Sequence, residues 1–556
     1  MAVIRITLPY NHNENDLARA VANRFGRGTP YRILRRSLDA RQRNIVVEYH
    51  LTTDISDPAD RITDGIRKQN MRLDRHFRNT PRPRPIVVGS GPAGLFCAYW
   101  LSIHGFRPLL LEQGPPLAIR LRDIARFIKT GALDPFSNIC FGAGGAGTYS
   151  DGKLTTRIRS PFIPFIAATL VRHGAPEEIR YLSEPHLGSN GIRRCIARFL
   201  ATLETQGVDI RYSSRICDFE SRRDGMTLRV SRACAGASAA SNEEEISISG
   251  ATLFLACGHS ARETYRLLRK RGVRMEAKEF AVGIRIEHPA RAVDEMRYGA
   301  DYRSRYPGIE HARYRFAQTW KDEGRAVYTF CMCPGGHVVN AASGDDGVVT
   351  NGMSNARRAG RFSNAAVVVN VSHYDLEHGG YEGPDGGCTL QCEVEERCRA
   401  AVNHPGSAFV VPAQKLEDFL EGRRSSSIDR SSCLNPIAPA SLHEHLPSFV
   451  TDAIRRGMVL FDRKMPGFAT HPEAKVFGPE TRTSSPYRVV RHPVHLVSVS
   501  HPDLYPMGEG AGYAGGIVSS AVDGIRCAQA FIERFIESER FDSATVRHRS
   551  SDEPVD

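Results

Sequence analysis

The chain has 556 residues, of which 41% are hydrophobic and 24% charged, and its formal net charge is +12. This length exceeds what a single hydrophobic core usually serves, so two or three domains are expected. No apolar run reaches the ~18 residues of a membrane-spanning helix, and the first residues carry no export signal, so we expect a cytoplasmic protein without a membrane partner. The thirteen cysteines lack framework spacing and are expected to be reduced thiols.

Residues 1–84 are predicted to form a small basic α+β module of strand, helix, strand and helix. They hold 17 Lys and Arg against 9 Asp and Glu. The charge favours either an acidic partner such as nucleic acid or a solvated face, and we prefer the second because charge alone is a weak signal. The segment TPRPRP cannot continue a helix and is predicted to be a stiff linker.

A compact strand–loop–helix–strand unit follows, in which the strand IVV precedes GSGPAG and an apolar helix. The glycine pattern between a buried strand and a helix predicts a dinucleotide site. Gly89 would form the tight turn, Gly91 would approach a pyrophosphate, and Gly94 would let helix and strand pack closely. Glu112 ends the second strand and would bind a ribose hydroxyl. The pyrophosphate would lie on the helix N-terminus, formed by Ser90, Pro92 and Ala93.

The stretch FGAGGAGTYSDGKL, residues 141–154, is predicted to return to the cofactor. Gly144, Gly145 and Gly147 would let backbone lie against the flavin or the pyrophosphate. Lys153 is a candidate catalytic residue, because a cation near the flavin could stabilise its reduced form. The alternative is a flexible surface loop.

Apolar alternations between Gly207 and Gly258 (VDIRY, MTLRVS and ISISGATLFLACG) predict three successive strands of a β-meander. Near the C-terminal end, LYPMGEGAGYAGGI leads into a second apolar helix. A second helix N-terminus preceded by Gly-Glu is what a flavin needs, so FAD is favoured over NAD. The residues predicted to bind it are Gly508, Glu509, Gly515, Gly516 and Ile517.

Eight motifs between about residue 30 and residue 535 resemble, in the same order, the bacterial and plastid family of poorly characterised FAD-dependent dehydrogenases. They are GSGPAGL, FGAGGAGTYSDGKLTTR, LACGHSARETY, FAVGIRIEHP, VYTFCMCPGGHVVNA, GVVTNGMS, ETRTSSPYRV and YPMGEGAGYAGGI. The resemblance implies the NAD(P)/FAD-dependent oxidoreductase superfamily, a glutathione-reductase-type FAD fold and FAD as cofactor. Family members usually carry Glu in FGEGGAG, where this chain has Ala143, so any role of that carboxylate is absent here.

Three further patterns carry weaker signals. Cys331 and Cys333 could exchange electrons with flavin, but packing beside the cofactor pocket is the preferred interpretation. The three cysteines of CTLQCEVEERC do not have zinc spacing, and no metal site is expected. Arg482 is a second candidate catalytic residue that could pair with a substrate carboxylate or the flavin's pyrimidine edge; an exposed loop arginine is the equal alternative.

The predicted fold is therefore α/β plus α+β, with a Rossmann-like FAD-binding domain that carries a β-meander, an inserted β-rich substrate domain and the small N-terminal module. The predicted boundaries are 1–84 for the module, 85–270 and 471–537 for the two parts of the FAD-binding domain, 271–470 for the inserted domain, and 538–556 for a disordered tail.

The predicted function is a FAD-dependent oxidoreductase that moves a hydride between a small-molecule substrate and flavin N5. No second strand–GxGxxG–helix unit follows residue 112, so NAD(P)H is expected only as a transient donor. Three alternatives remain: a flavin-dependent monooxygenase, a flavin-dependent RNA-modifying enzyme that uses the basic module, and a non-catalytic flavoprotein whose flavin only stabilises the fold. Nucleic acid is not the expected partner.

Overall fold

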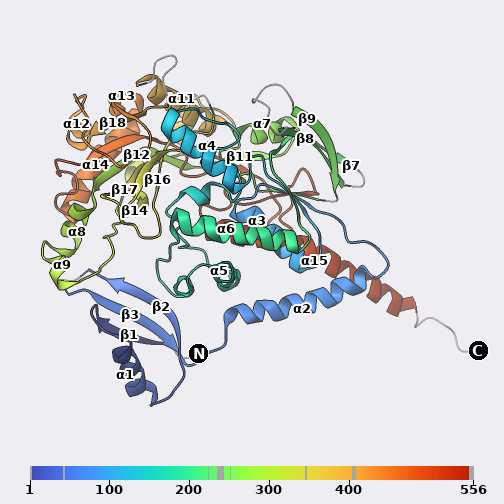
Figure 1. The fold of residues 1–556 in the computed structure, drawn as a ribbon. Helices are drawn as coiled ribbons and strands as arrows, with labels where there is room; N and C mark the ends of the chain where they lie inside the picture. Colours follow the sequence, from blue (N-terminus) through green and yellow to red (C-terminus); the bar gives the residue numbers. More distant parts are fainter. Residues whose placement is uncertain are drawn as a thin grey trace, which may run out of the picture.

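The computed structural model describes residues 3–41, 44–222, 225–233, 243–250, 252–344, 347–402 and 409–549 (Figure 1). Its helices and strands form a mixed α/β protein with several separate sheets, and one of these sheets belongs to the Rossmann-like region. No helix in these ranges is long and apolar enough to cross a membrane.

The N-terminal module is a three-stranded antiparallel sheet with one helix. The strands β1 (Val3–Pro9), β3 (Val46–Thr52) and β2 (Arg32–Asp39) lie in the order β1-β3-β2, and α1 (Glu14–Phe25) packs against them. The strand β2 was not predicted, because the arginine-rich RILRRSLD was interpreted as a solvated face. It is an edge strand, and its Arg36 exchanges backbone hydrogen bonds with residues on either side of Leu182.

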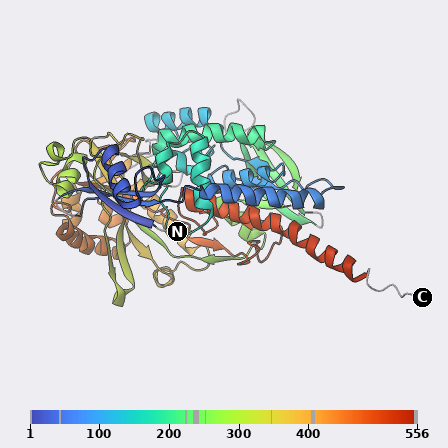
Figure 2. The ribbon, with the colours of Figure 1, turned by 90° about the horizontal axis from the view of Figure 1, so that it is seen from below.

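The helix α2 (Pro58–His76) does not belong to this module, contrary to the prediction for residues 1–84. Its buried Ile66 and Leu73 join the largest hydrophobic core of the chain. Figures 1 and 2 show α2 beside α15 (Ile517–Arg549), away from α1 and the module's sheet. The amphipathic pattern of α2 predicted a helix, but it does not tell which apolar surface the helix covers.

The dinucleotide-binding unit is a five-stranded parallel sheet in the order β22-β10-β4-β5-β6. Its strands are β4 (Ile86–Val88), β5 (Leu109–Leu111), β6 (Asp209–Arg211), β10 (Leu253–Leu255) and β22 (Leu504–Pro506). Segments more than four hundred residues apart thus join one sheet, as the discontinuous domain in the prediction required.

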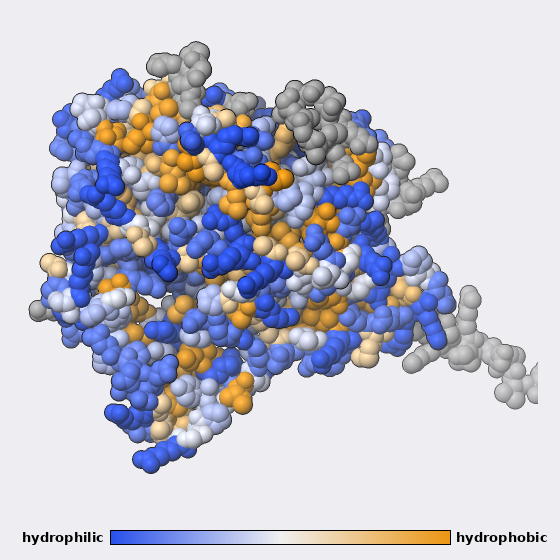
Figure 3. Space-filling view, in the orientation of Figure 1, coloured by the Kyte–Doolittle hydropathy of each residue, from blue (hydrophilic) through white to orange (hydrophobic). Residues whose placement is uncertain are grey.

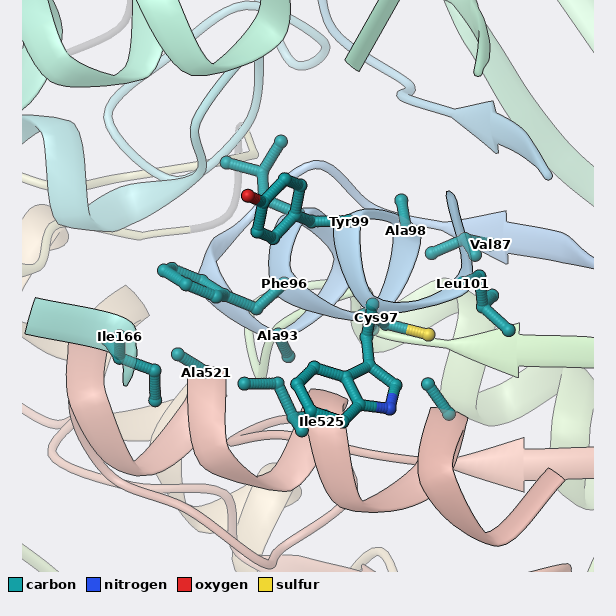
Figure 4. Close-up of a cluster of buried hydrophobic side chains, with 14 of the residues drawn as sticks. Val87, Ala93, Phe96, Cys97, Ala98, Tyr99, Leu101, Ile166, Ala521 and Ile525 are labelled. Carbon is teal, nitrogen blue, oxygen red and sulfur yellow. The ribbon is translucent and has the colours of Figure 1, made fainter. Parts of the chain in front are cut away.

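The helices α3 (Pro92–Ile103) and α15 pack together against this sheet. Every residue of α3 from Ala93 to Leu101 is buried, and Figure 4 shows Phe96, Cys97 and Ala93 beside Ala521 and Ile525 of α15. A Cβ on Gly524 would lie 2.1 Å from the backbone oxygen of Ala93, so this contact needs glycine. The close packing places the N-termini of the two helices near each other.

The β-meander consists of β7 (Ser214–Arg222), β8 (Gly225–Ala233) and β9 (Glu243–Gly250). The predicted first strand, VDIRY, instead contains β6 at the edge of the parallel sheet. The meander was therefore predicted correctly as a motif, but its first strand was assigned wrongly.

The inserted region is built on a seven-stranded sheet in the order β13-β14-β17-β12-β20-β18-β19. Its strands are β12 (Phe280–Pro289), β13 (Ala317–Trp320), β14 (Arg325–Cys333), β17 (Phe362–Val371), β18 (Val411–Lys415), β19 (Ile437–Pro439) and β20 (Lys475–Glu480). Because β20 pairs with β12 and β18, this sheet extends past the predicted boundary at residue 470.

Two small sheets and the remaining helices complete the described fold. Two-stranded sheets form between β11 (Met275–Ala277) and β21 (Tyr487–Val489), and between β15 (His337–Asn340) and β16 (Thr350–Met353). The remaining α-helices are α4 (Leu117–Thr130), α5 (Phe162–Arg172), α6 (Gly188–Thr205), α7 (Arg262–Lys270), α8 (Ala290–Tyr298), α9 (Tyr302–Arg305), α10 (His373–His378), α11 (Gly386–Ala400), α12 (Leu416–Glu421), α13 (Leu442–His445) and α14 (Ser448–Lys464).

The end of the chain departs from the predicted disordered tail of residues 538–556. The backbone of α15 is helical as far as Arg549, and residues 550–556 lie outside the described residues.

Figure 3 shows a largely hydrophilic surface over this face of the molecule, with hydrophobic residues scattered in small groups.

Candidate dinucleotide-binding site

The carboxyl ends of the parallel strands meet at one edge of the five-stranded sheet. The loop Gly89–Gly91 follows β4, Glu112 follows β5, His259 lies shortly after β10, and Glu509 shortly after β22. Ligands of open parallel sheets bind outside this edge, so four segments that are distant in sequence face the same place.

The glycines of GSGPAG are required by close backbone contacts. Gly89 has φ +98°, and a Cβ there would lie 2.4 Å from the oxygen of Ala256. A Cβ on Gly94 would lie 1.8 Å from the oxygen of Gly89, so helix and strand approach as the fingerprint predicts. Around Gly91 the nearest atom to such a Cβ is 3.9 Å away, on Gly145, which leaves that backbone accessible to a ligand.

The loop FGAGGAGTYSDGKL lies against the same helix N-terminus. Gly145 has φ +65°, and a Cβ on it would lie 2.8 Å from the Cα of Gly91. A Cβ on Gly147 would approach the Ile517 side chain to 3.3 Å. The segments around Gly91, Gly145 and Ile517 therefore meet in one place, which we call the cradle. The alternative of a free surface loop is not what the structure describes.

Two helix N-termini border the cradle. The N-cap of α3 is Gly91, which has no side chain to bind the first N–H groups, and Pro92 occupies the first turn. Gly515 and Gly516 before α15 are exposed, and a Cβ on Gly515 would meet no described atom within 4 Å. Free N–H groups and the helix dipole favour anions at both ends. This donor set, with open backbone beside it, fits the pyrophosphate and the flavin of FAD.

Cavity volume does not identify this site. The cavity beside Pro92, Gly147 and Ile517 measures only about 20 Å³, whereas a larger one of about 430 Å³ lies in the N-terminal module between Pro9 and Asp16. The backbone contacts are the better guide, because they identify where a dinucleotide can touch the chain without side-chain obstruction.

Glu112 is almost fully buried and ties the fingerprint to the glycine loop. Its Oε2 accepts hydrogen bonds from Ser90 N at 2.9 Å and Ser90 Oγ at 2.6 Å. Its Oε1 accepts from Gly114 N at 3.0 Å and Gly142 N at 3.1 Å. In this structure the carboxylate organises the two loops, and its contact with a ribose stays a prediction.

Arg120 of α4 holds the glycine loop from behind and was missed by sequence reasoning. Its side chain is fully buried, and its guanidinium donates to the backbone oxygens of Asn138, Ile139 and Ala143, among others, and to Thr148 Oγ1. Burial lowers the pKa of Arg120 to about 10. An arginine within the amphipathic IRLRDIARF gives no signal in the sequence that it faces inward.

Glu509 has a partner that the sequence did not reveal. Its Oε1 lies 2.9 Å from His259 Nδ1, and both side chains are partly exposed. The pair joins the ends of two neighbouring strands beside the cradle. The predicted contact of Glu509 with the flavin's ribityl region is not tested by this geometry.

Lys153 lies at the end of the glycine loop. Its Nζ donates to the backbone oxygen of Met332 and lies 3.7 Å from Asp151 Oδ2. Asp151 is 1% exposed and accepts hydrogen bonds from Arg358 and Ser354. Burial raises the pKa of Asp151, but the charges of Lys153 and Arg358 outweigh it and hold that pKa below its usual value. The structure thus places Lys153 between the loop and the seven-stranded sheet.

Arg482, the other candidate catalytic residue, is buried in an ion-pair network. Its Nη2 lies 2.9 Å from Glu395 Oε2, while Arg262 Nη2 lies 2.9 Å from Glu395 Oε1. Burial raises the pKa of Glu395, but the two guanidiniums outweigh it and lower that pKa to about 2. With 9% of its side chain exposed, Arg482 is not an exposed loop arginine, and its contact with a substrate carboxylate or the flavin's pyrimidine edge stays a prediction.

Comparisons with known proteins agree with the geometry. Residues 279–483 match the family "FAD-dependent protein, C-terminal domain-like", residues 87–136 match an NAD(P)-binding Rossmann-like domain, and residues 2–53 match a domain of unknown function. A protein of Clostridium beijerinckii, described as uncharacterized, is 35% identical over 532 residues, which cover 90% of this chain and 92% of the relative.

Solved flavoproteins are more distant. CtdE in complex with FAD is 12% identical, with 81% of this chain and 84% of that chain covered and a TM-score of 0.33. A flavoprotein/dehydrogenase from Cytophaga hutchinsonii is 10% identical, with 82% and 78% covered and a TM-score of 0.32. Halogenase PltM is 11% identical, with 83% and 71% covered and a TM-score of 0.34. Similarities at these TM-scores add nothing to the assignment.

The fold and the cradle define a flavoprotein with a Rossmann-like dinucleotide-binding region. The chain belongs to the family of FAD-dependent proteins whose C-terminal domain it carries, and its cofactor is FAD.

Proposed function

We propose that this chain is a FAD-dependent oxidoreductase of the dehydrogenase or reductase type, which moves a hydride between a small-molecule substrate and flavin N5. The observation that carries the proposal is the convergence of Gly91, Gly145 and Ile517, which brings two helix N-termini and a side-chain-free loop together. Bound FAD supplies the two-electron chemistry.

The chain's own groups bind the cofactor and stabilise negative charge on it. The N–H groups at the start of α3 bind the pyrophosphate, and the positive end of α15 stabilises negative charge on the reduced flavin. Lys153 adds a cation at the far end of the loop, with 30% of its side chain exposed. The contacts of α15 and Lys153 favour two-electron reduction, because they act on charge that develops only in the reduced state.

The electron donor is either the substrate itself or NAD(P)H that binds transiently. GSGPAG is the GxGxxG unit on which FAD binds in this proposal, and the two other GxGxxG matches, GAGGAG and GAGYAG, lie in loops assigned to the same cofactor, which leaves none for a resident nicotinamide. A flavin-dependent monooxygenase would use the same site and would differ in coupling oxygen consumption to a hydroxylated product.

A role in RNA modification has less support. Several arginines of the N-terminal module already contact acidic groups or backbone of the module itself: Arg5 pairs with Glu48, Arg41 with Asp39, and Arg32 donates to the Asp54 oxygen. These contacts reduce the charge that the module can offer to a phosphate backbone.

The experiment is anaerobic reduction of the purified holoprotein, followed by its visible spectrum. We expect bound FAD to bleach with NADH, NADPH or an electron-donating substrate, and to re-oxidise with an acceptor. Persistence of the oxidised spectrum with NADH, NADPH and a panel of alcohol, amine and hydroxy-acid donors, under conditions in which dithionite bleaches it, would contradict a dehydrogenase or reductase.

A further inference from the structure

The strand β14 ends in an irregularity that contains Cys331, Met332 and Cys333. The pairing of β14 with β17 shifts register between Phe330 and Cys333. Cys331 has φ +46°, a left-handed conformation that residues other than glycine rarely adopt. Bulges of this kind redirect side chains and are common beside active sites, and such backbone strain persists only where the surrounding structure enforces it.

The two thiols contact each other and differ in exposure. They share a side-chain hydrogen bond, while Cys333 also donates to the Cys331 oxygen at 3.4 Å. Cys333 is fully buried, whereas Cys331 is partly exposed. One thiol is therefore reachable by a reagent and the other is shielded behind it, as in a pair of attacking and resolving cysteines.

The charges around the pair favour a thiolate on Cys331. The hydrogen bond from Cys333 is the largest effect, and with the Lys153 ammonium and the Arg285 guanidinium it outweighs burial and lowers the pKa of Cys331 to about 5. The same contact raises the pKa of Cys333. Asp151 and Glu480 also face the pair, but each is bound to an arginine of its own, Arg358 and Arg285. The contact therefore favours a thiolate on Cys331 and a protonated thiol on Cys333.

The pair also lies at the end of the loop that lines the cradle. Gly145 and Gly147 contact Gly91 and Ile517, and a few residues later Lys153 Nζ donates to the backbone oxygen of Met332, between the two cysteines. One short segment thus joins the flavin site to the two thiols.

We propose that Cys331 and Cys333 form a redox-active dithiol, a second two-electron centre that exchanges electrons with the flavin through reversible disulfide formation. When the S–S bond forms, the Cys331 thiolate and the Cys333 thiol release two electrons and one proton. Oxidised FAD would accept the two electrons and the proton, which gives its anionic reduced form. The proposal rests on the bound FAD and extends the proposed function, but it does not depend on the identity of the substrate.

The chain contains a natural control pair, Cys388 and Cys392 on α11. These thiols also share a hydrogen bond, and that contact lowers the pKa of Cys388 to about 7. They stand four residues apart in a helix, where Cβ atoms are ~5–6 Å apart, whereas a disulfide needs ~3.5–4.5 Å. Cys331 and Cys333 are not held at such a fixed spacing, because β14 breaks register with β17 between Phe330 and Cys333.

The first test is disulfide formation in the FAD-loaded protein. After treatment with diamide, alkylation with iodoacetamide under denaturing conditions and peptide mass spectrometry should find Cys331 and Cys333 linked and Cys388 and Cys392 alkylated. Dithiothreitol should restore alkylation of the first pair. Full alkylation of Cys331 and Cys333 after diamide would overturn the proposal.

The second test counts electrons by anaerobic dithionite titration of the oxidised holoprotein. Wild type should take up about four electrons per FAD, and Cys331→Ser or Cys333→Ser about two, because one disulfide couple accepts two. The double variant Cys388→Ser/Cys392→Ser should behave as wild type. Equal uptake by wild type and both single variants would overturn electron exchange with flavin. Dithionite supplies the electrons directly, so this result is separate from whether NADH, NADPH or any substrate reduces the enzyme.

Discussion

Two buried carboxylates, Glu395 and Asp151, each lie between two cations, but only one of these clusters is closed. Glu395 accepts hydrogen bonds from both Arg262 and Arg482, and its ion-pair distances to both are 2.9 Å. With 1% of its side chain exposed, its charge is compensated entirely within the protein.

The Asp151 cluster is open on one side. Arg358 binds Asp151 closely, but Lys153 lies 3.7 Å away and donates instead to a backbone oxygen beside the two cysteines. Arg358 Nη1 is buried without a hydrogen-bond partner among the described residues. The difference separates a cation whose carboxylate partner is fully enclosed from one that is only loosely paired, although the sequence named both Lys153 and Arg482 as candidate catalytic residues.

The largest effect is expected from removing the central acid of the closed cluster. Glu395→Gln leaves two buried guanidiniums without a counter-charge, and breaking a buried pair in this way costs ~3–5 kcal/mol of unfolding free energy. Urea unfolding followed by circular dichroism measures the loss. The exposed Glu393→Gln on the same helix is the control and should cost at most ~1 kcal/mol. Equal losses for the two variants would contradict the closed cluster.

The next comparison exchanges the two cations for an apolar side chain of similar length. Arg482→Met should destabilise the protein strongly, because Glu395 is buried behind it, whereas Lys153→Met should cost ~1 kcal/mol or less at its partly exposed position. Lys153→Met should in turn lower the flavin reduction potential and slow alkylation of Cys331, while Arg482→Met should leave both unchanged. Spectroelectrochemistry and timed iodoacetamide labelling check these expectations. A lower potential and slower labelling in Arg482→Met but not in Lys153→Met would contradict the roles assigned to the two cations.

A smaller effect is expected from pH. The pKa of Glu395 is about 2, against 4.5 for an ordinary glutamate, so its folded state holds fewer protons than the unfolded state between these values. Its contribution to stability is complete above pH ~4.5 and is lost as the pH falls towards ~2. Unfolding free energies measured from pH 5 to pH 2.5 should fall less steeply in Glu395→Gln than in wild type. Identical slopes would contradict the depressed pKa.

Local patterns in the sequence predicted the dinucleotide-binding unit well. Gly94 acts within the turn that begins at Gly89, so the spacing of the two glycines alone implies the close contact between them that the structure contains. The strand β2 pairs with the next strand along the chain and was missed because its arginines suggested a solvated face. The docking of α2 was not predicted, because it depends on a surface distant in sequence. The pairing of β20 with β12 was missed for the same reason, since strand order is not encoded locally.

The site shows the same division. The glycines of the 141–154 loop could be assigned to a cofactor from their number and context. Arg120, the His259–Glu509 pair and the Glu395 cluster could not, because their partners lie elsewhere in the fold and single polar residues carry no periodicity. Nor does the sequence indicate that β14 breaks register at Cys331, which distinguishes that cysteine from a packing residue.

The central claim, that FAD lies in the cradle formed by Gly91, Gly145 and Ile517, is tested most directly by FAD retention in two alanine variants. Gly145 and Gly272 both have positive φ, at +65° and +77°, but a Cβ on Gly145 would meet Gly91 at 2.8 Å, whereas one on Gly272 would meet nothing within 4 Å. Gly145 also has ψ −169°, a backbone conformation essentially restricted to glycine, so the unfolding free energy of each variant is measured beside its FAD content to separate strain from obstruction of the cradle. The FAD-to-protein ratio from the visible spectrum, with the released cofactor identified after heating, should fall at least tenfold in Gly145→Ala and remain at the wild-type value in Gly272→Ala. Equal FAD content in the two variants would contradict the account.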